Sequence, residues 1–150
     1  MIFGIGESPI DVVVEKYNYS PGETIKGKVI LKLKKPTKAK QLKVALIGEK
    51  MLKEMQVTSA SIKSKERKRE IYRFEIPLDR EKEYLTGEYT FEIKIPSNLM
   101  QTLPEGAAGE IIKTIQILAG SESITRWYVK AYLDIPLGLD ISKQIQINIA

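Results

Sequence analysis

Apolar and polar residues alternate along most of this chain, in short segments separated by turn residues. Successive side chains of a β-strand point to opposite faces, so a strand with one buried face shows this alternation. A parallel sheet would instead show continuous apolar strands with helices between them. The pattern therefore predicts an all-β, antiparallel, immunoglobulin-like sandwich. The alternating segments are 10–14, 24–34, 41–47, 70–76, 87–95, 126–134 and 143–149.

In each segment the apolar set of alternate positions is expected to face the core. The polar set is expected to face solvent, because a sandwich strand has only one buried face. The predicted inward-facing residues are Ile10, Val12, Val14, Ile25, Val29, Leu31, Leu33, Leu42, Val44, Leu46, Tyr72, Phe74, Ile76, Tyr89, Phe91, Ile93, Ile95, Trp127, Val129, Ala131, Leu133, Ile145, Ile147 and Ile149.

Turn residues lie between these segments. Pro21 and Gly22 stand at the centre of Ser-Pro-Gly-Glu, where proline presets φ and glycine allows a positive φ. Pro96 and Pro136 follow predicted strands and end them, because proline cannot donate to a sheet ladder. With no internal repeat and no linker, residues 1–150 are predicted to form a single domain.

Two segments do not fit the simple alternation. Residues 51–62 are expected to form an irregular strand at a sheet edge. Residues 105–119 carry apolar side chains at helical spacing, which favours one short helix at about 107–118 that plugs an open end of the sandwich.

The amino-acid composition excludes several kinds of catalytic and metal-binding site. The chain has no histidine and no cysteine, which excludes Ser-His-Asp and Cys-His catalysis and every His- or Cys-based zinc site. No glycine-rich phosphate loop is present, so we expect no enzyme, no cofactor and no metal. The N-terminus lacks a signal-peptide pattern and no cysteine is used, so a cytoplasmic location is expected. Charged residues make up 29%, which suits a heat-adapted (thermophile) protein.

The net charge of +5 is concentrated in the first half of the chain, where 17 Lys and Arg stand against 9 Asp and Glu. The densest basic run lies within 63–69. It is a candidate contact for an acidic protein partner, nucleic acid or an anionic membrane. The alternative, which charge runs usually favour, is a solvated hairpin that protects a sheet edge from aggregation. The candidate partner-binding residues are Lys63, Lys65, Arg67, Lys68 and Arg69.

Three weaker candidates have structural explanations that we favour. Lys26, Lys28, Lys32 and Lys34 form an outward row that Glu88 and Glu92 would balance if their strands pair. Tyr128 and Tyr132 beside Lys130 could stack bases, but outward aromatics more often cover a neighbouring loop or helix. Asp134 and Asp140 could hold a cation, but they are better explained as turn caps.

An ordered set of motifs resembles the N-terminal domain of arrestins. The run 17–29, Tyr-Asn-Tyr-Ser-Pro-Gly-Glu-Thr-Ile-Lys-Gly-Lys-Val, is followed by a strand from Leu42 to Gly48. The later segments 86–91, 95–97 and 127–131 match in the same order. Gly4-Ile5-Gly6 and the segment 133–140 are similar to the bacterial and archaeal sporulation-control branch of this superfamily.

The resemblance implies a non-enzymatic adaptor or scaffold, which binds another protein through loops and a sheet edge. Proteins of this family usually have two sandwich domains, so a single domain also leaves a homodimer open. The basic first half of the chain leaves a second alternative, a surface that binds nucleic acid or an anionic membrane.

If Trp127 faces the core as predicted, Trp127→Ala should lower the free energy of unfolding by about 3–5 kcal/mol. Urea denaturation followed by far-UV circular dichroism measures this loss. A loss below about 1 kcal/mol, the range of most exposed positions, would show that the faces of this strand are assigned the wrong way round.

Overall fold

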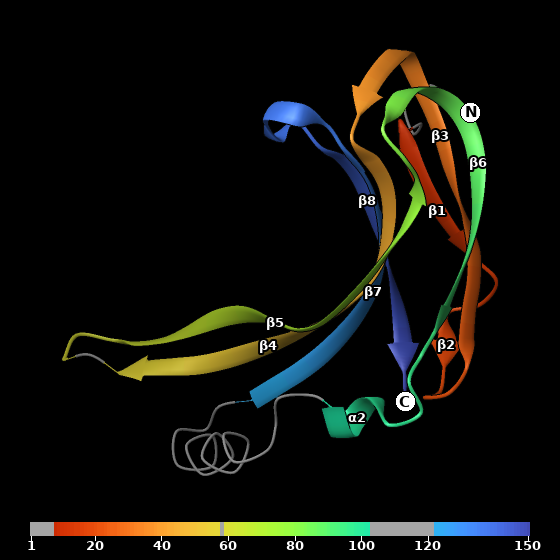
Figure 1. Cartoon of the computed structure of the whole chain (residues 1–150). Helices are drawn as coiled ribbons and strands as arrows, with labels where there is room; N and C mark the ends of the chain where they lie inside the picture. The colour runs from red at the N-terminus through yellow and green to blue at the C-terminus, as the bar shows by residue number, and fades with distance from the viewer. Residues whose placement is uncertain (1–7, 58, 103–121) are drawn as a thin grey trace, which may run out of the picture.

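The computed structural model describes residues 8–57, 59–102 and 122–150. They form two packed sheets, which confirms the predicted β-sandwich (Figure 1). The smaller sheet has the order β1-β3-β6 and the larger has the order β2-β8-β7-β4-β5. The strands are β1 (Ile10–Val14), β2 (Asn18–Tyr19), β3 (Thr24–Ala39), β4 (Gln41–Val57), β5 (Ile62–Asp79), β6 (Lys82–Lys94), β7 (Glu122–Asp134) and β8 (Ile141–Ile149), with a short helix α2 (Leu99–Thr102) and a 3-10 turn η1 (Pro136–Gly138).

Strand pairing is antiparallel except for the two residues of β2, which pair in parallel with β8. The predicted turn at Ser20 is present. Glu23 N donates to Ser20 O at 3.0 Å, and Gly22 has φ of +95°, which a residue with a side chain rarely adopts. This turn sets the start of β3, which lies between β1 and β6.

The core fills the space between the two sheets, and most of the predicted inward-facing residues are buried in it. Trp127, Val129, Ala131 and Leu133 all lie on the buried face of β7, as predicted. Sequence alternation located this core because each of these strands has one face against the opposite sheet.

Phe74 is an exception among the predicted core residues. It pairs with Leu46 and therefore lies on the predicted face, but 43% of it is exposed. The reason is the unequal width of the sheets, since β5 is the last strand of the five-stranded sheet. Three strands cannot cover five, so the inner face of β5 is only partly buried.

The structure also differs from the irregular edge strand that we expected at residues 51–62. Residues 51–57 continue β4 as a regular strand, and residues 51–53 lie between β5 and β7 rather than at a sheet edge. The helix predicted at 107–118 falls outside the described residues. Within the described part of the chain no helix is long and apolar enough to cross a membrane.

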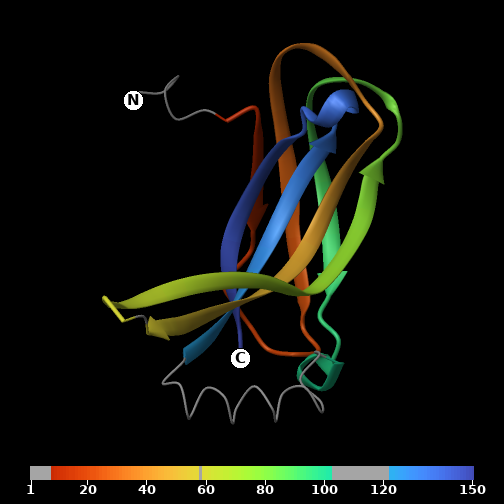
Figure 2. The same cartoon turned by 90° about the vertical axis from the view of Figure 1, so that its left-hand side faces the viewer.

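The five-stranded sheet is strongly bent (Figure 1). At one end β4 and β5 leave the sandwich together and project from it as a long hairpin, which Figure 1 shows from the side and which comes toward the viewer in Figure 2. We call the face of this sheet that lies toward the three-stranded sheet the inner face, and the opposite face the outer face. Among the described residues, the hairpin extends beyond the smaller sheet (Figures 1 and 2).

Where the register between β4 and β5 shifts, after Gly48, an aromatic ring packs on this glycine. Trp127 pairs with Gly48 across β7 and β4, and a Cβ atom on Gly48 would lie 2.6 Å from the Trp127 ring. Tyr72 contacts the same ring edge to face, with the ring centroids 5.8 Å apart. Trp127 therefore fills the space left by the missing side chain, and Tyr72 limits how far the ring can move.

We expect Gly48→Ala to destabilise the fold by about 1–3 kcal/mol, because the added methyl overlaps a ring that is held on its other side. In a Trp127→Ala background the same change should cost much less, since the overlap is gone. Urea denaturation of the four proteins in this double-mutant cycle measures the difference. Equal losses in both backgrounds would contradict the contact.

Candidate partner-binding surface

The projecting hairpin carries all five predicted basic residues. We define the arm as residues 49–57 of β4 and 62–70 of β5, which pair without interruption from Glu49 opposite Glu70 to Val57 opposite Ile62. At the tip Val57 and Ile62 are 73% and 65% exposed. The predicted residues Lys63, Lys65, Arg67, Lys68 and Arg69 all lie on β5 and are exposed.

A β-bulge at Ile71 decides which way these side chains point. Gly48 pairs with Tyr72 and Glu49 pairs with Glu70, so Ile71 is an extra residue on β5. An extra residue reverses the alternation on its own strand. Tyr72 therefore lies on the inner face with Gly48, while Glu70 lies on the outer face with Glu49.

Because of this reversal, the basic residues of β5 are divided between the inner and the outer face of the arm. Lys68 pairs with Met51 on the outer face, between Glu66 and Glu70, so the outer face of the arm has mixed charge. On the inner face β5 presents basic side chains only, at every second position. These are Lys63, Lys65, Arg67 and Arg69.

The arm also contains a sheet edge. In the described residues β5 pairs only with β4 and ends the order of the five-stranded sheet. An edge strand has backbone N–H and C=O groups on the side that no neighbour occupies. The arm thus combines an edge strand with a row of positive charge.

A second group of polar side chains lies on the outer face of the sheet, nearer to the sandwich. Glu75 accepts a hydrogen bond from the Tyr132 hydroxyl and from Arg73 Nη1, the latter at 2.5 Å, and Lys43 Nζ lies 3.8 Å from it. Arg73 also donates to Glu70 through Nε at 2.5 Å. These contacts tie β4, β5 and β7 together at the base of the arm.

The network changes the proton affinities of its members. The Tyr132 hydrogen bond lowers the pKa of Glu75 below its usual 4.5, and Arg73 and Lys43 lower it further, while partial burial opposes the change. Burial raises the pKa of Tyr132 to about 12, and the negative charge of Glu75 adds to the increase. At neutral pH Glu75 is therefore ionised and Tyr132 is protonated, as the hydrogen bond between them requires.

This network bears on our expectation for Tyr132, one of the two outward tyrosines. The Nζ atoms of Lys43 and Lys130 lie 5.7 Å and 5.8 Å from the centroid of the Tyr132 ring, so among the described residues these lysines, rather than a loop or helix, lie against it. Ala45 and Ile47 are buried although their register places them on the outer face. A base stacked on the Tyr132 ring would therefore have to displace the Lys43 and Lys130 side chains.

Two of the other candidates, Asp140 and Lys28, have the structural roles that we favoured. Asp140 accepts a hydrogen bond from Ile135 N at 2.9 Å, as a turn cap does. Lys28 forms an ion pair with Glu88 at 3.0 Å across β3 and β6, as the predicted strand pairing requires. Within the described residues no group of three or more carboxylates is placed to hold a metal ion.

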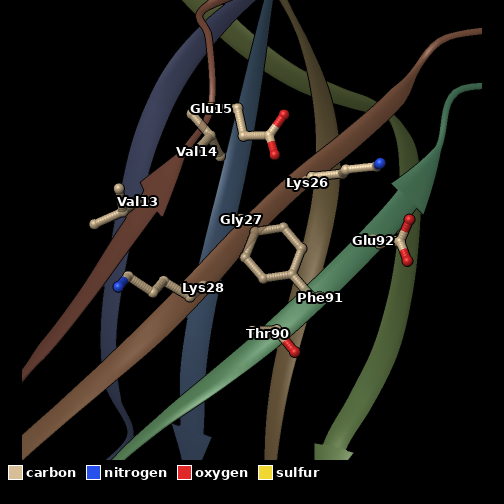
Figure 3. A pocket seen from close by; sticks show the side chains of 9 residues that line it. All are labelled: Val13, Val14, Glu15, Lys26, Gly27, Lys28, Thr90, Phe91 and Glu92. Carbon is tan, nitrogen blue, oxygen red and sulfur yellow. The ribbon is translucent and has the colours of Figure 1, made fainter.

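A hollow of about 530 Å³ lies on β1, β3 and β6 (Figure 3). The Phe91 ring lies beside Gly27, which has no side chain in its way. The charged lining has both signs, and it contains none of the five predicted binding residues. Its charged residues are Glu15, Lys26, Lys28 and Glu92.

The protein is an arrestin-like β-sandwich, in which a three-stranded sheet of order β1-β3-β6 packs on a five-stranded sheet of order β2-β8-β7-β4-β5. The family described as arrestin (or S-antigen), N-terminal domain, matches residues 10–149. The chain belongs to this family, whose members are generally non-enzymatic and generally bind protein partners.

A similar solved structure is that of Spo0M, a sporulation control protein from Bacillus subtilis. The TM-score is 0.53 at 17% sequence identity, and the match covers 96% of this chain and 49% of that one. This chain therefore spans about half the length of Spo0M, and at this identity the likeness concerns the fold. No curated protein matches the sequence.

Glu75→Gln should lower the free energy of unfolding by about 1 kcal/mol at pH 7, because charge-assisted hydrogen bonds to Tyr132 and Arg73 are weakened. The pKa of Glu75 is lowered in the folded state, so this stabilisation is present above pH 4.5 and is lost as the pH falls through the folded pKa. Urea denaturation at a series of pH values from 7 downward through the acid range measures the loss. Glu81→Gln, at an exposed loop residue, is the control, and an effect independent of pH would contradict the role of the charge.

Proposed function

We propose that this protein is a non-enzymatic adaptor that binds another protein through the arm and its neighbouring loops. The observation that carries the proposal is the arm itself, an exposed hairpin that extends beyond the core. A fold needs no such projection for its own stability, because most of the arm's residues bury little surface. The general role of the family in binding proteins supports the same conclusion.

In this proposal the basic side chains act first on the rate of association. Positive charge on a projecting element attracts an acidic partner before contact, and this raises the association rate more than the final affinity. The exposed apolar pair at the tip, Val57 and Ile62, then adds contact area once the partner has docked.

The proposal also excludes catalysis by the chain. The sequence has no histidine, which is the commonest general base. Without histidine and cysteine the chain also cannot form the Ser–His or Cys–His pairs that activate a nucleophile. Glu75, a carboxylate with a lowered pKa, is held in ion pairs with Arg73 and Lys43. A cytoplasmic location fits the absence of cysteine.

A second candidate function is binding to an anionic surface, either nucleic acid or a membrane. It is favoured by one observation, the row of basic residues that follows the exposed apolar pair Val57 and Ile62 along the arm. Such binding would weaken steeply with salt, because each phosphate contact releases a counterion. A protein–protein contact with an apolar component would persist at higher salt.

Affinity capture tests the two functions against each other. The immobilised protein is incubated with nuclease-treated lysate of the source organism, and bound material is eluted with rising salt and identified by mass spectrometry. A discrete protein retained at high salt supports the adaptor. Nucleic acid or lipid released at modest salt would replace the adaptor by the second candidate, and a second copy of this chain would indicate a homodimer.

Neutralising four basic residues of the arm tests electrostatic steering. We expect the variant Lys65→Gln, Arg67→Gln, Lys68→Gln, Arg69→Gln to associate with the captured partner about tenfold more slowly at low salt, with an unchanged melting temperature. Surface plasmon resonance at several salt concentrations measures the association rate.

The matched control removes the same charge elsewhere, at the exposed positions Lys32, Lys34, Lys35 and Lys38 of β3. This control should change the association rate much less, because these residues do not belong to the arm. An equal reduction in both variants would show that only the net charge of the protein matters.

A further inference from the structure

We propose that the β5 edge of the arm binds an extended acidic segment of the partner as an added antiparallel or parallel strand, with an acidic residue at every second position. The inference rests on the proposed adaptor function and specifies the chemistry of the partner. Its basis is the combination of a long regular edge with a row of basic side chains whose spacing matches that of a strand.

The edge is regular over the whole arm. From Glu70 to Ile62 each residue of β5 has one partner on β4, with no bulge and no proline. The nine residues make an edge of roughly 30 Å at the usual rise of a strand. The part of β5 nearer the sandwich differs, because the bulge at Ile71 and Pro77 interrupt the ladder there. Such interruptions prevent strand addition, so the arm is the section of β5 that can accept a new neighbour.

The charges on the edge select the sequence of the added strand. Lys63, Lys65 and Arg69 are exposed on the inner face, and Arg67 lies between them at the same spacing. Residues at alternate positions of one strand are about 7 Å apart, and a neighbouring strand has the same spacing on the same face. A segment with Asp or Glu at positions i, i+2, i+4 and i+6 can therefore place one carboxylate beside each basic side chain.

The same geometry argues against a second copy of this chain as the added strand. Two arms paired edge to edge would bring two rows of positive charge together, and like charges on neighbouring strands are destabilising. The outer face would not distinguish acidic from basic partners, because Lys68 lies there between Glu66 and Glu70. The inner face thus determines the charge of the partner, and the backbone edge determines its extended conformation.

Two synthetic peptides of identical composition separate strand addition from general charge attraction. One alternates Thr and Glu over nine residues with four Glu, and the other carries its four Glu as one block. We expect the alternating peptide to bind about fivefold more tightly by isothermal titration calorimetry. In amide hydrogen exchange followed by NMR, it should slow the exchange of every second amide between residues 62 and 70.

A pair of single substitutions gives a matched control within the arm. Lys65→Gln and Lys68→Gln remove the same charge from exposed positions of the same strand, but on opposite faces. Lys65→Gln should weaken binding of the alternating peptide about threefold or more, and Lys68→Gln should leave it nearly unchanged. Both variants lie in an exposed segment, so their melting temperatures should match the unaltered protein.

The outcomes distinguish this inference from the proposed function on which it rests. Equal binding of both peptides without protection of alternate amides would overturn strand addition, while electrostatic steering of a protein partner would survive. Absence of binding by either peptide, with the captured partner still bound, would likewise overturn the acidic strand and leave the adaptor intact. Tighter binding of a nine-nucleotide single strand or of vesicles with anionic lipid than of the alternating peptide would overturn both.

Discussion

The core of this protein lies between sheets of unequal width, and this inequality determines which parts of the larger sheet are available to a partner. Three strands cover the inner face near β8, β7 and β4, where the largest buried side chains lie. They leave β5 only partly covered, as the exposure of Phe74 indicates. The larger sheet bends away from the smaller one, and the arm, which starts after Gly48, projects beyond the smaller sheet (Figure 1).

The base of the arm is fixed from both faces. On the inner face the Trp127 ring packs on Gly48 and against Tyr72. On the outer face Glu75 joins Tyr132 and Arg73 by hydrogen bonds. An exposed hairpin would have little stability alone, but its strands continue directly into this packed region. The direction in which the arm projects is therefore set by the body of the sandwich.

The bulge at Ile71 connects this architecture to the proposed function. It lets Tyr72 pack on the inner face and at the same time turns Arg69, Arg67 and Lys65 to that face. Without the extra residue the inner face of the arm would carry Glu66, Lys68 and Glu70 instead, a surface of mixed charge. One backbone irregularity thus converts a basic run in the sequence into a row of positive charge beside a sheet edge.

The sequence by itself determined the fold class, the turn at Gly22 and most of the core, because alternation records which face of each strand is buried. It also located the basic run at 63–69, but it could not say which of those residues act together. That depended on the register between β4 and β5, which arises from long-range pairing. The exposure of Phe74 and the burial of Ala45 likewise followed from tertiary structure alone, since each depends on which distant strands and side chains cover a given face.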